Sequence, residues 1–413
     1  MNTFRMRRAA AFLLAGALSV GCDNDSTGPD ENKIPIGGLF SITGNWATLG
    51  VTSKAAMELG IDDVNQYLAA GNPGLQFTAS IMDTKLDPAT ALTQATAMKG
   101  AGIEVIIGPQ SSAEVASLKP YVDANNMLVI SQSSTAGTLA IAGDNIFRLT
   151  PSDTLEAVAL VAVMKADGIK TAIPFWRNDA GNTGLQTATR LLFPGTGTSV
   201  TAGVQYTATQ TDFAPSLAAL KTQIQAAVAA SGNAATVAVA HAGFDEVVDI
   251  MKLAAADPVF SSVRWYGTDG TALNEPLRAN AQAAAFARSV SFLTPTPGVG
   301  DASLTRREPI AARIAAKAGM QPDAFALAVY DAVWITAQAY LAVGGRGHQA
   351  ALKSALVTAA DGFYGTSGWT KLNAAGDRKF GDFDFFSLIT SGGANAWKLT
   401  VQYDTQTNVL TRK

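Results

Sequence analysis

The segment 105–135 brings together hydroxyl side chains that could bind an anion. Its pattern predicts an apolar strand at 105–108, a helix at about 113–123 and a second strand at 127–131. Both strands are followed by hydroxyl residues, which are Ser111, Ser112, Ser133, Ser134 and Thr135. In an open α/β sheet, ligands bind beyond the carboxyl ends of the strands, so these hydroxyls are expected at a binding edge.

Ser111 and Ser112 also stand where the expected helix would begin. The first turn of a helix has backbone N–H groups without partners and carries the positive end of the helix dipole. Together with the hydroxyls, this arrangement favours a carboxylate ligand. The alternative is that the serines act only as helix caps and turn residues.

Alternating strands and helices on both sides of this segment predict the sheets that would position it. The strands expected in the first part of the chain are 34–41, 75–82, 105–108, 127–131 and 146–149. Those expected further on are 171–176, 199–206, 236–241 and 265–267. Helical patterns between them, such as 88–99 and 184–192, indicate crossover connections, which favour parallel sheets covered on both faces. The expected fold class is α/β, with two parallel-sheet lobes and a ligand cleft between them.

The composition limits the classes of protein to which the chain can belong. Its 413 residues exceed what one core usually organises, and 48% hydrophobic against 15% charged residues indicate a large buried interior. The net charge is −3 and no basic patch occurs, so nucleic acid is not expected as a partner. No cofactor is expected, because the sequence lacks the P-loop, dinucleotide, zinc-protease and EF-hand patterns.

Cysteine and histidine are too scarce for a metal site or a thiol pair. Cys22 is the single cysteine, and His241 and His348 are the two histidines. We therefore expect no metal and no enzymatic activity. One alternative is a hydrolase that uses His241, which falls at the end of an expected strand near the cleft.

The amino terminus has the pattern of an export signal. Residues 1–21 contain three arginines followed by an apolar run at 9–18, and the run is too short to span a membrane. Cys22 follows directly and resembles the lipidated cysteine of a bacterial lipoprotein, with an ordinary cleaved signal as the alternative. Residues 22–33 read as a flexible tether. These features predict a periplasmic protein anchored to the membrane by a lipid.

Several segments resemble, in order and spacing, bacterial periplasmic solute-binding proteins of the leucine/isoleucine/valine-binding type. The segments are FSITGNWATLG at 40–50, 108–135, FRLTPSD at 147–153, TDF at 211–213, YDA at 330–332 and FYGTSGWTKLNAAGDR at 363–378. The resemblance implies two Rossmann-like lobes joined by three crossovers, with a hinge that closes on a small-molecule ligand. It also implies delivery of that ligand to an ABC-type permease, by a protein that we expect to be a monomer.

The resemblance also predicts how the chain divides between the lobes. Lobe one would comprise 34–151 and 293–345. Lobe two would comprise 152–292 and 346–413.

The family's amino-acid site can be carried over to four residues. Its α-carboxylate is bound by residues that correspond to Ser112, Ser134 and Thr135. The acidic residue that binds its α-amino group corresponds to Asp269, which is shorter than the Glu of the branched-chain binder. The alternative role of Asp269 is a helix N-cap or Asx-turn before 272–277.

The sequence departs from the family where aromatic residues are usual. Gly181 stands after RNDA in place of a ring, and Gly243 stands at a second such position, next to Phe244. Trp46 and Trp176 are the candidates to supply a replacing ring, although each could instead pack in the interior. We therefore expect a ligand with a carboxylate, an amine and an apolar remainder, but not the branched-chain specificity. A ligand-sensing receptor that signals to a regulatory partner remains the alternative function.

Overall fold

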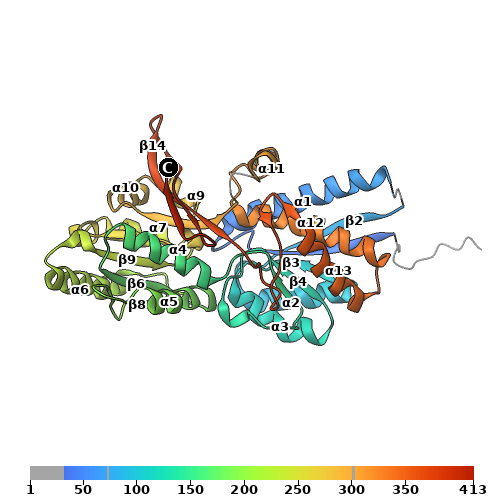
Figure 1. Ribbon diagram of the computed structural model, residues 1–413, viewed down its shortest axis with the longest axis horizontal. Helices are drawn as coiled ribbons and strands as arrows, with labels where there is room; N and C mark the ends of the chain where they lie inside the picture. The colour runs from blue at the N-terminus through green and yellow to red at the C-terminus, as the bar shows by residue number, and fades with distance from the viewer. Residues whose placement is uncertain (1–31, 72–73, 300–302) are drawn as a thin grey trace, which may run out of the picture. The chain divides into compact units, whose positions relative to one another are not determined.

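The computed structural model describes residues 32–71, 74–299 and 303–413, all within one compact unit, Glu31–Lys413. The expected signal at 1–21, Cys22 and nearly all of the tether lie outside the described residues. The described chain contains two large sheets, each covered by helices on both faces (Figure 1). The α/β class expected from the sequence is therefore confirmed.

The first sheet is wholly parallel and has the strand order β2-β1-β3-β4-β5. Its strands are β1 (Lys33–Phe40), β2 (Gln76–Asp83), β3 (Val105–Ile107), β4 (Leu128–Ser131) and β5 (Ile146–Arg148). β3, β4 and β5 are buried along their whole length, as parallel strands covered on both faces should be. They are apolar except for Ser131 at the end of β4 and Arg148 at the end of β5.

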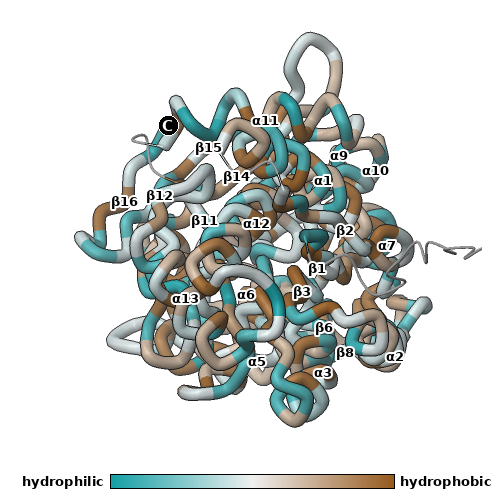
Figure 2. The backbone as a smooth tube through the Cα atoms, turned by 90° about the vertical axis from the view of Figure 1, so that its right-hand side faces the viewer, coloured by the Kyte–Doolittle hydropathy of each residue, from teal (hydrophilic) through white to brown (hydrophobic). Residues whose placement is uncertain are grey.

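Alternate side chains of β3 enter the two cores on opposite faces of the first sheet. Val105 and Ile107 pack in the core that contains α1 (Ala47–Ala69) and α12 (Ala324–Val343). Ile106 packs in the core made by the helices α2 (Pro88–Gly100) and α3 (Ser112–Ala124). Apolar stretches such as β3 can be followed in the hydropathy colouring of Figure 2.

The second sheet is mixed, with a parallel part and an antiparallel part. Its strand order is β16-β15-β14-β11-β10-β9-β6-β7, and β8 also pairs with β6. The parallel strands are β6 (Thr171–Asn178), β7 (Ser199–Val200), β8 (Val204–Thr207), β9 (Val237–Ala242), β10 (Arg264–Tyr266) and β11 (Leu293–Gly298). The antiparallel strands are β14 (Asp382–Ser391), β15 (Ala394–Asp404) and β16 (Val409–Arg412).

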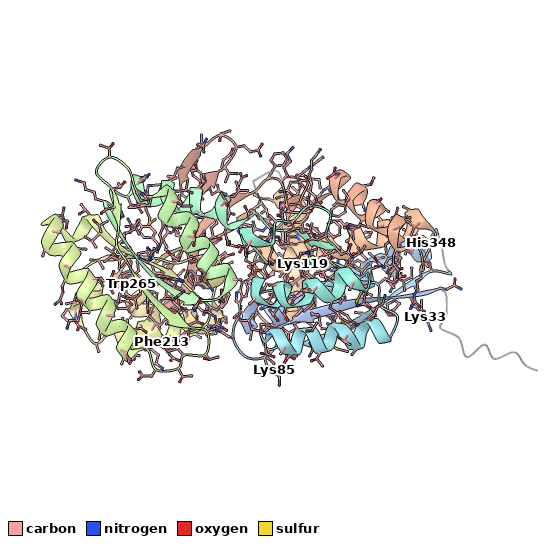
Figure 3. The ribbon with its side chains drawn as sticks, turned by 90° about the horizontal axis from the view of Figure 1, so that it is seen from below. Lys33, Lys85, Lys119, Phe213, Trp265 and His348 are labelled. Atoms are coloured by element: carbon pink, nitrogen blue, oxygen red, sulfur yellow. The ribbon has the colours of Figure 1, made fainter. Side chains whose placement is uncertain are left out.

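The helices of the second sheet also divide between two cores. On one face α4 (Asp153–Ala166) packs against the sheet, and α5 (Ala180–Leu192) contacts α4. The other core contains α6 (Ala214–Ser231), α7 (Val247–Ala254) and α10 (Ala281–Ser289). Trp265 and Phe213, labelled in Figure 3, belong to this second core.

The chain crosses between the two sheets three times. The crossings follow β5, follow β11 on the way to α11 (Leu304–Ala318), and lead from the small hairpin β12 (Tyr364–Gly365) and β13 (Gly368–Trp369) to β14. At the third crossing the backbone N–H of Arg148 donates to the Gly376 carbonyl, and the N–H of Arg378 donates to the Arg148 carbonyl. These bonds form a single parallel β-bridge between Arg148 of β5 and Asp377.

Two segments pack differently from the division expected from the sequence. The sequence places 293–298 in lobe one, but β11 is hydrogen-bonded between β10 and β14 of the second sheet. The sequence places 349–362 in lobe two, but Leu352, Leu356 and Ala360 of α13 (Gln349–Gly362) are buried in the first sheet's core with α12. The rest of the division remains a prediction.

Among the described residues, α12 is the one helix with the length and hydropathy of a membrane span. Buried residues make up 72% of its apolar stretch, and it lies against α1 and the first sheet. It therefore has the environment of a core helix.

Candidate functional site

A small cavity of about 20 Å³ lies at the carboxyl ends of strands from both sheets. The residues that line it are Trp46, Ser111, Ser112, Ser133, Thr135, Asp153, Asp179, Gly181, Asn182, Leu185, Phe244 and Asp269. Nearly all of them follow strand ends, with Ser111 after β3, Ser133 after β4, Phe244 after β9 and Asp269 after β10. This is the edge at which α/β sheets bind ligands. The volume is enough for about one water molecule.

Ser112 lies at the centre of a cluster of hydroxyl side chains that also contains Ser134 and Thr135, and we call it the hydroxyl cluster. Its Oγ accepts hydrogen bonds from the Ser134 hydroxyl at 3.1 Å and from the backbone N–H groups of Thr135 and Ala136 at 3.2 and 3.1 Å. Because the oxygen acts as acceptor in these contacts, the hydrogen of Ser112 remains available for another acceptor. Ser134 does not line the cavity and lies behind Ser112.

Ser111 has the capping role that was the alternative for these serines. Its hydroxyl accepts from the backbone N–H of Glu114 at 3.3 Å, and the Glu114 carboxylate accepts from Ser111 N–H at 3.0 Å and from its hydroxyl at 2.6 Å. This reciprocal pair is a capping box that fixes the start of α3. It leaves Ser112 one residue inside the helix, facing the loop after β4.

Gly108 and Gln110 hold the loop after β3 against the loop after β1. Gly108 has φ +94, and a Cβ there would lie 2.1 Å from the carbonyl oxygen of Leu39, so only glycine fits. The Gln110 side chain accepts from Ser41 N–H at 3.1 Å and donates to the Trp46 carbonyl at 3.0 Å. These contacts position Trp46 beside the serines.

Three carboxyl groups line the cavity opposite the hydroxyl side chains, and the sequence singles out only Asp269 among them. Asp153 begins α4, is 2% exposed, and its backbone N–H donates to the Thr135 carbonyl at 2.9 Å. Burial raises its pKa to about 8, and the charge of Asp269 adds to the shift. The sequence contains Asp153 in FRLTPSD, where an acidic residue at a helix start is explained equally well by the helix dipole.

Glu156 and Asp269 form a close acidic pair next to Asp153. The backbone N–H of Asp269 donates to Glu156 Oε1 at 3.1 Å. Burial raises the pKa of Asp269 to about 7 and raises the pKa of Glu156 well above its ordinary value. Asp269 Oδ1 accepts from Gly270 N–H at 2.7 Å, while the cap of the short 3-10 turn at Asp269–Thr271 is Thr268. Asp269 is thus placed in the cavity.

Asp179 is the acidic residue of the cavity that has a cationic partner. It caps α5 by accepting from Asn182 N–H at 2.9 Å, and it pairs with Arg177 at 2.8 Å. Burial raises its pKa, and the Arg177 charge opposes that shift. No lysine, arginine or histidine occurs among the described residues that line the cavity.

Two loops from opposite sheets meet over the cavity, and we call their contact residues Asn45, Trp46, Phe244, Asp245 and Glu246 the latch. The Trp46 ring stacks on Phe244 with centroids 4.5 Å apart. The Asn45 amide donates to Glu246 at 2.7 Å, and its oxygen accepts from Asp245 N–H at 2.8 Å. The latch therefore joins the loop after β1 to the loop after β9.

The two tryptophans predicted as candidate rings lie in different places. Trp46 lines the cavity and is 5% exposed. Trp176 lies in β6 outside the cavity, where the Arg190 guanidinium stands over its ring at 5.1 Å. The ring next to the cavity on the second sheet is Phe244.

Gly243 and His241 belong to the packing beneath the latch. A Cβ on Gly243 would lie 2.4 Å from the Tyr206 hydroxyl, so no larger residue fits there. His241 is completely buried, its Nε2 lies 3.1 Å from the Tyr206 hydroxyl, and burial lowers its pKa to about 4. His241 thus contacts a tyrosine of the core and does not line the cavity.

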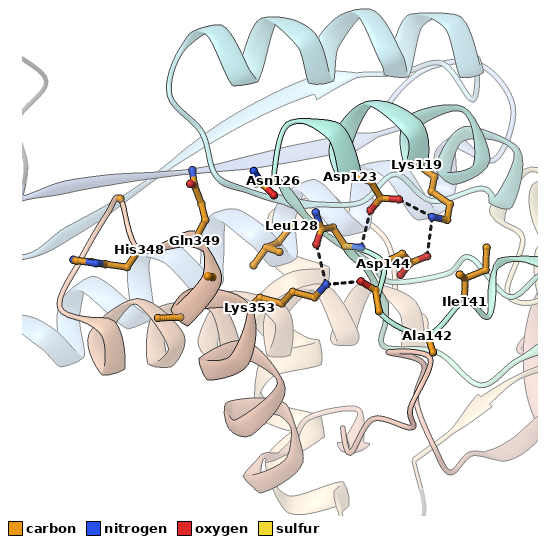
Figure 4. A pocket seen from close by; sticks show the side chains of 15 residues that line it. Lys119, Asp123, Asn126, Leu128, Ile141, Ala142, Asp144, His348, Gln349 and Lys353 are labelled. Atoms are coloured by element: carbon orange, nitrogen blue, oxygen red, sulfur yellow. Dashed lines mark hydrogen bonds and ion pairs between the residues drawn. The ribbon is translucent and has the colours of Figure 1, made fainter.

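A larger and more open groove, of about 1060 Å³, lies at the opposite edge of the first sheet. Figure 4 shows its lining, which includes Lys119, His348 and Lys353. Lys353 Nζ donates to the Gly143 carbonyl at 2.8 Å and to Asn145 at 3.0 Å, just before β5. Because Asn145 precedes β5, the groove lies at the amino end of that strand and is separate from the cavity. In the part of the chain that is described, no group of three or more His, Cys, Asp or Glu residues is arranged to hold a metal.

The chain is similar to known proteins over most of its length. Residues 52–391 match the family described as the receptor family ligand binding region. The uncharacterized protein MJ1266 of Methanocaldococcus jannaschii is 27% identical over 431 residues, which cover 98% of this chain and 99% of that protein.

Solved structures share the fold at low sequence identity. The branched-chain amino acid transporter substrate binding protein LivJ of Streptococcus pneumoniae, in complex with isoleucine, has a TM-score of 0.69 and 20% identity, covering 89% of this chain and 99% of that one. A solute binding protein of an ABC transporter from Rhodopseudomonas palustris BisB5, in complex with 3,4-dihydroxy benzoic acid, has a TM-score of 0.72 and 15% identity, covering 91% and 98%.

Proposed function

The chain belongs to the receptor family ligand binding region, with the type I periplasmic-binding fold, and on that premise we propose that it captures a small amine-bearing carboxylate outside the cytoplasm. In this proposal the lobes close on the ligand, and the loaded protein delivers it to an ABC-type permease. The observation that carries the proposal is the cavity in which Ser112 and Thr135 face Asp153 and Asp269.

The two sides of the cavity suit the two charged ends of an amino acid. Ser112 can donate its hydroxyl hydrogen to a carboxylate beside the start of α3, where the helix dipole favours an anion. Asp269 and Asp153 can accept from an ammonium group. The apolar surfaces of Trp46 and Phe244 then bound the remainder of the ligand.

The small cavity supports capture by movement of the lobes. A cavity of about 20 Å³ holds about one water, so an amino acid requires the loops to separate before it enters. A ligand that contacts both sides binds the closed arrangement better and shifts the equilibrium toward it. Ligand-sensing by the same closure is the second candidate, because the matching family is described as a receptor region.

Substitution of Asp269 tests the proposed ligand chemistry. Asp269→Ala should weaken binding of the amino acid that co-purifies with the protein, as identified by mass spectrometry, by about 3 kcal/mol or more, the scale for breaking a buried pair. The des-amino analogue of that amino acid should lose far less, because it brings no ammonium group. Isothermal titration calorimetry measures both losses.

Asp249→Ala is the matched control, since the Asp249 carboxylate is exposed on α7 and, among the described residues, forms an ion pair with Lys252 at the surface. Equal affinities of the Asp269 variant and the parent for both compounds would contradict the proposed site.

Genes for a permease and an ATPase beside the coding gene would support transport, and genes for a kinase or regulator would support sensing. Turnover of the bound compound would support a hydrolase instead.

A further inference from the structure

We propose that the cavity selects a ligand with two ammonium groups separated by a short chain, an inference that rests on the proposed function and specifies its ligand class. Three carboxyl side chains lie at or beside the cavity without forming an ion pair with any described lysine, arginine or histidine. Asp153 and Asp269 line the cavity, and Glu156 lies beside Asp269 without lining it. Burial raises the pKa of Asp153 and the positive charge of Arg148 opposes this rise, but this guanidinium is already paired with Asp377 at 2.5 and 2.7 Å.

Two of these carboxyl groups have an oxygen that still needs a donor. Asp153 Oδ2 and Glu156 Oε2 are buried and have no hydrogen-bond partner among the described residues. Asp153 is 2% exposed and lines the cavity, and Glu156 is 1% exposed. Buried acceptors without donors are costly, so a ligand that supplies N–H groups at these oxygens gains both a hydrogen bond and a neutralised charge.

The acidic groups define two positions. Glu156 and Asp269 are joined through the 3.1 Å hydrogen bond from Asp269 N–H, so they form one of them. Asp153 forms the other, with its Oδ2 directed at α5, where Gly184 provides the room because a Cβ there would lie 2.5 Å away. Asp153 and Glu156 are three residues apart on α4, so their Cβ atoms are about 5–6 Å apart on one face of the helix.

The charge balance distinguishes a diamino ligand from an ordinary amino acid. Asp179 is neutralised by Arg177, whereas Asp153, Glu156 and Asp269 have no such partner among the described residues. Burial raises the pKa of all three, so without a ligand they are partly protonated near neutral pH, and a bound cation would favour their ionised forms. A neutral amino acid brings one ammonium group and one further carboxylate, so it leaves the net charge of the cavity unchanged. A diamino acid or a diamine has a net positive charge. An ammonium group also offers three directed donors, which fits oxygens that lie in different directions.

The test compares ligands of equal length that differ only in the second amine. Isothermal titration calorimetry at pH 7.5 would measure 2,4-diaminobutyrate against 2-aminobutyrate, and ornithine against norvaline. We expect the diamino compound of at least one pair to bind tenfold or more tightly than its partner. Glu156→Gln and Asp153→Asn should each reduce that preference tenfold or more, while the affinity for the monoamino compound changes less.

Controls separate this inference from the proposed function. Asp249→Asn, which removes an exposed carboxylate, should leave the preference unchanged, and thermal unfolding checks that each variant is folded. Because Gln and Asn keep the size of the native side chains, the two cavity variants should remain folded. If both members of every pair bind equally, or if Glu156→Gln and Asp153→Asn both keep the parental preference, the inference is wrong while amino-acid capture stands. If neither member of any pair binds and no small carboxylate co-purifies, the proposed function fails as well.

Discussion

Burial has the largest effect on the protonation of the acidic side chains in the cavity. The pKa values of Asp153 and Asp269 are raised to about 8 and about 7, and burial is the first cause of both shifts. Neighbouring carboxylates add to the shift of Asp153. The cavity is therefore partly protonated near neutral pH, and a cationic ligand would displace those protons.

Asp153 should make the stability of the ligand-free protein fall as pH rises. Its pKa is about 8 in the folded protein and about 3.9 in an unfolded chain. Its contribution to the free energy of unfolding is thus fully present below about pH 4 and is lost as pH rises to about 8, at about 1.4 kcal/mol for each pH unit in that range. Asp153→Asn should remove this part of the slope and leave the variant more stable than the parent at pH 8.

Thermal unfolding between pH 4 and pH 8.5 measures the effect. Glu156 and Asp269 remain in the variant, so a smaller slope should persist. Asp249→Asn serves as the control and should reproduce the parental curve. Parallel curves for the Asp153 variant and the parent would mean that Asp153 ionises normally.

At the scale of elements, the latch gives the closed arrangement a source of stability that does not depend on ligand. Asn45 alone makes two side-chain hydrogen bonds to the loop after β9, at 2.7 and 2.8 Å. The stacked rings of Trp46 and Phe244 add apolar contact to these bonds. The latch should therefore set the fraction of molecules that are closed before ligand binds.

Asn45→Ala should weaken ligand binding although Asn45 does not line the cavity. The variant loses two hydrogen bonds, which contribute about 1 kcal/mol each, so the closed fraction and the apparent affinity should fall by roughly thirtyfold when most parent molecules are open. Small-angle scattering of the ligand-free variant should give a radius of gyration that is equal to or larger than that of the ligand-free parent. Gln66→Ala, an exposed change on α1, is the control. An unchanged affinity would show that the latch contributes nothing to closure.

Local patterns predicted most of the elements, because buried parallel strands and their helices are recognisable from short segments. The strands at 105–107 and 128–131 and the helix at Pro88–Gly100 lie within a residue or two of their expected bounds. The strand expected at 199–206 is interrupted at Gly203, which has φ +72, so two short strands form instead. The sequence does not predict β11, because it contains Pro295 and Pro297. Proline has no backbone N–H, so strands tolerate it only where that donor is not needed for pairing.

The site was predictable only as far as it depends on strand ends. Ser112, Thr135, Trp46 and Asp269 meet at the cavity because each follows a strand of one of the sheets. Glu156 and the unpaired oxygen of Asp153 were not predictable, since their role depends on burial between α4 and neighbouring elements. The position of Trp176 depends on its packing against Arg190, which no local pattern encodes.

At the scale of the whole molecule, one buried ion pair joins the crossings to the binding loop. Arg148 and Asp377 are 1% and 3% exposed and form two contacts of 2.5 and 2.7 Å. The same guanidinium donates to the carbonyl oxygens of Ser134 and Ala136, at 3.3 and 2.6 Å. Asp377 is thus connected through Arg148 to the loop that surrounds Ser112.

Asp377→Ala should destabilise the protein and weaken ligand binding together. Removing one partner of a buried pair leaves the other charge unpaired and costs about 3–5 kcal/mol. Chemical denaturation measures this loss, and calorimetry measures the affinity. Lys252→Ala, which breaks an exposed pair on α7, should change stability by less than about 1 kcal/mol. A loss as small as that control would show that the Arg148–Asp377 pair has no structural importance.

The division of the chain between the sheets was the hardest feature to predict, because it depends on pairing between distant segments. β11 joins β14, nearly a hundred residues later, while α13 returns to the core of α1 and α12. The hydrophobic pattern of α13 shows that one face is buried but does not identify its partner. Such long-range choices need the three-dimensional structure.

The expected lipid anchor at Cys22 belongs to a part of the chain outside the described residues. Cys22→Ser should move the protein from the membrane fraction to the soluble fraction, or block its maturation, because the serine cannot take the lipid. Two acyl chains give stable attachment, whereas one is marginal, so the loss should be nearly complete. The thermal unfolding of the released protein should match the parent, since Lys33 onward contains both sheets. Ser26→Ala in the tether is the control. Membrane attachment that survives in the Cys22 variant would require another anchor and would contradict the lipoprotein assignment.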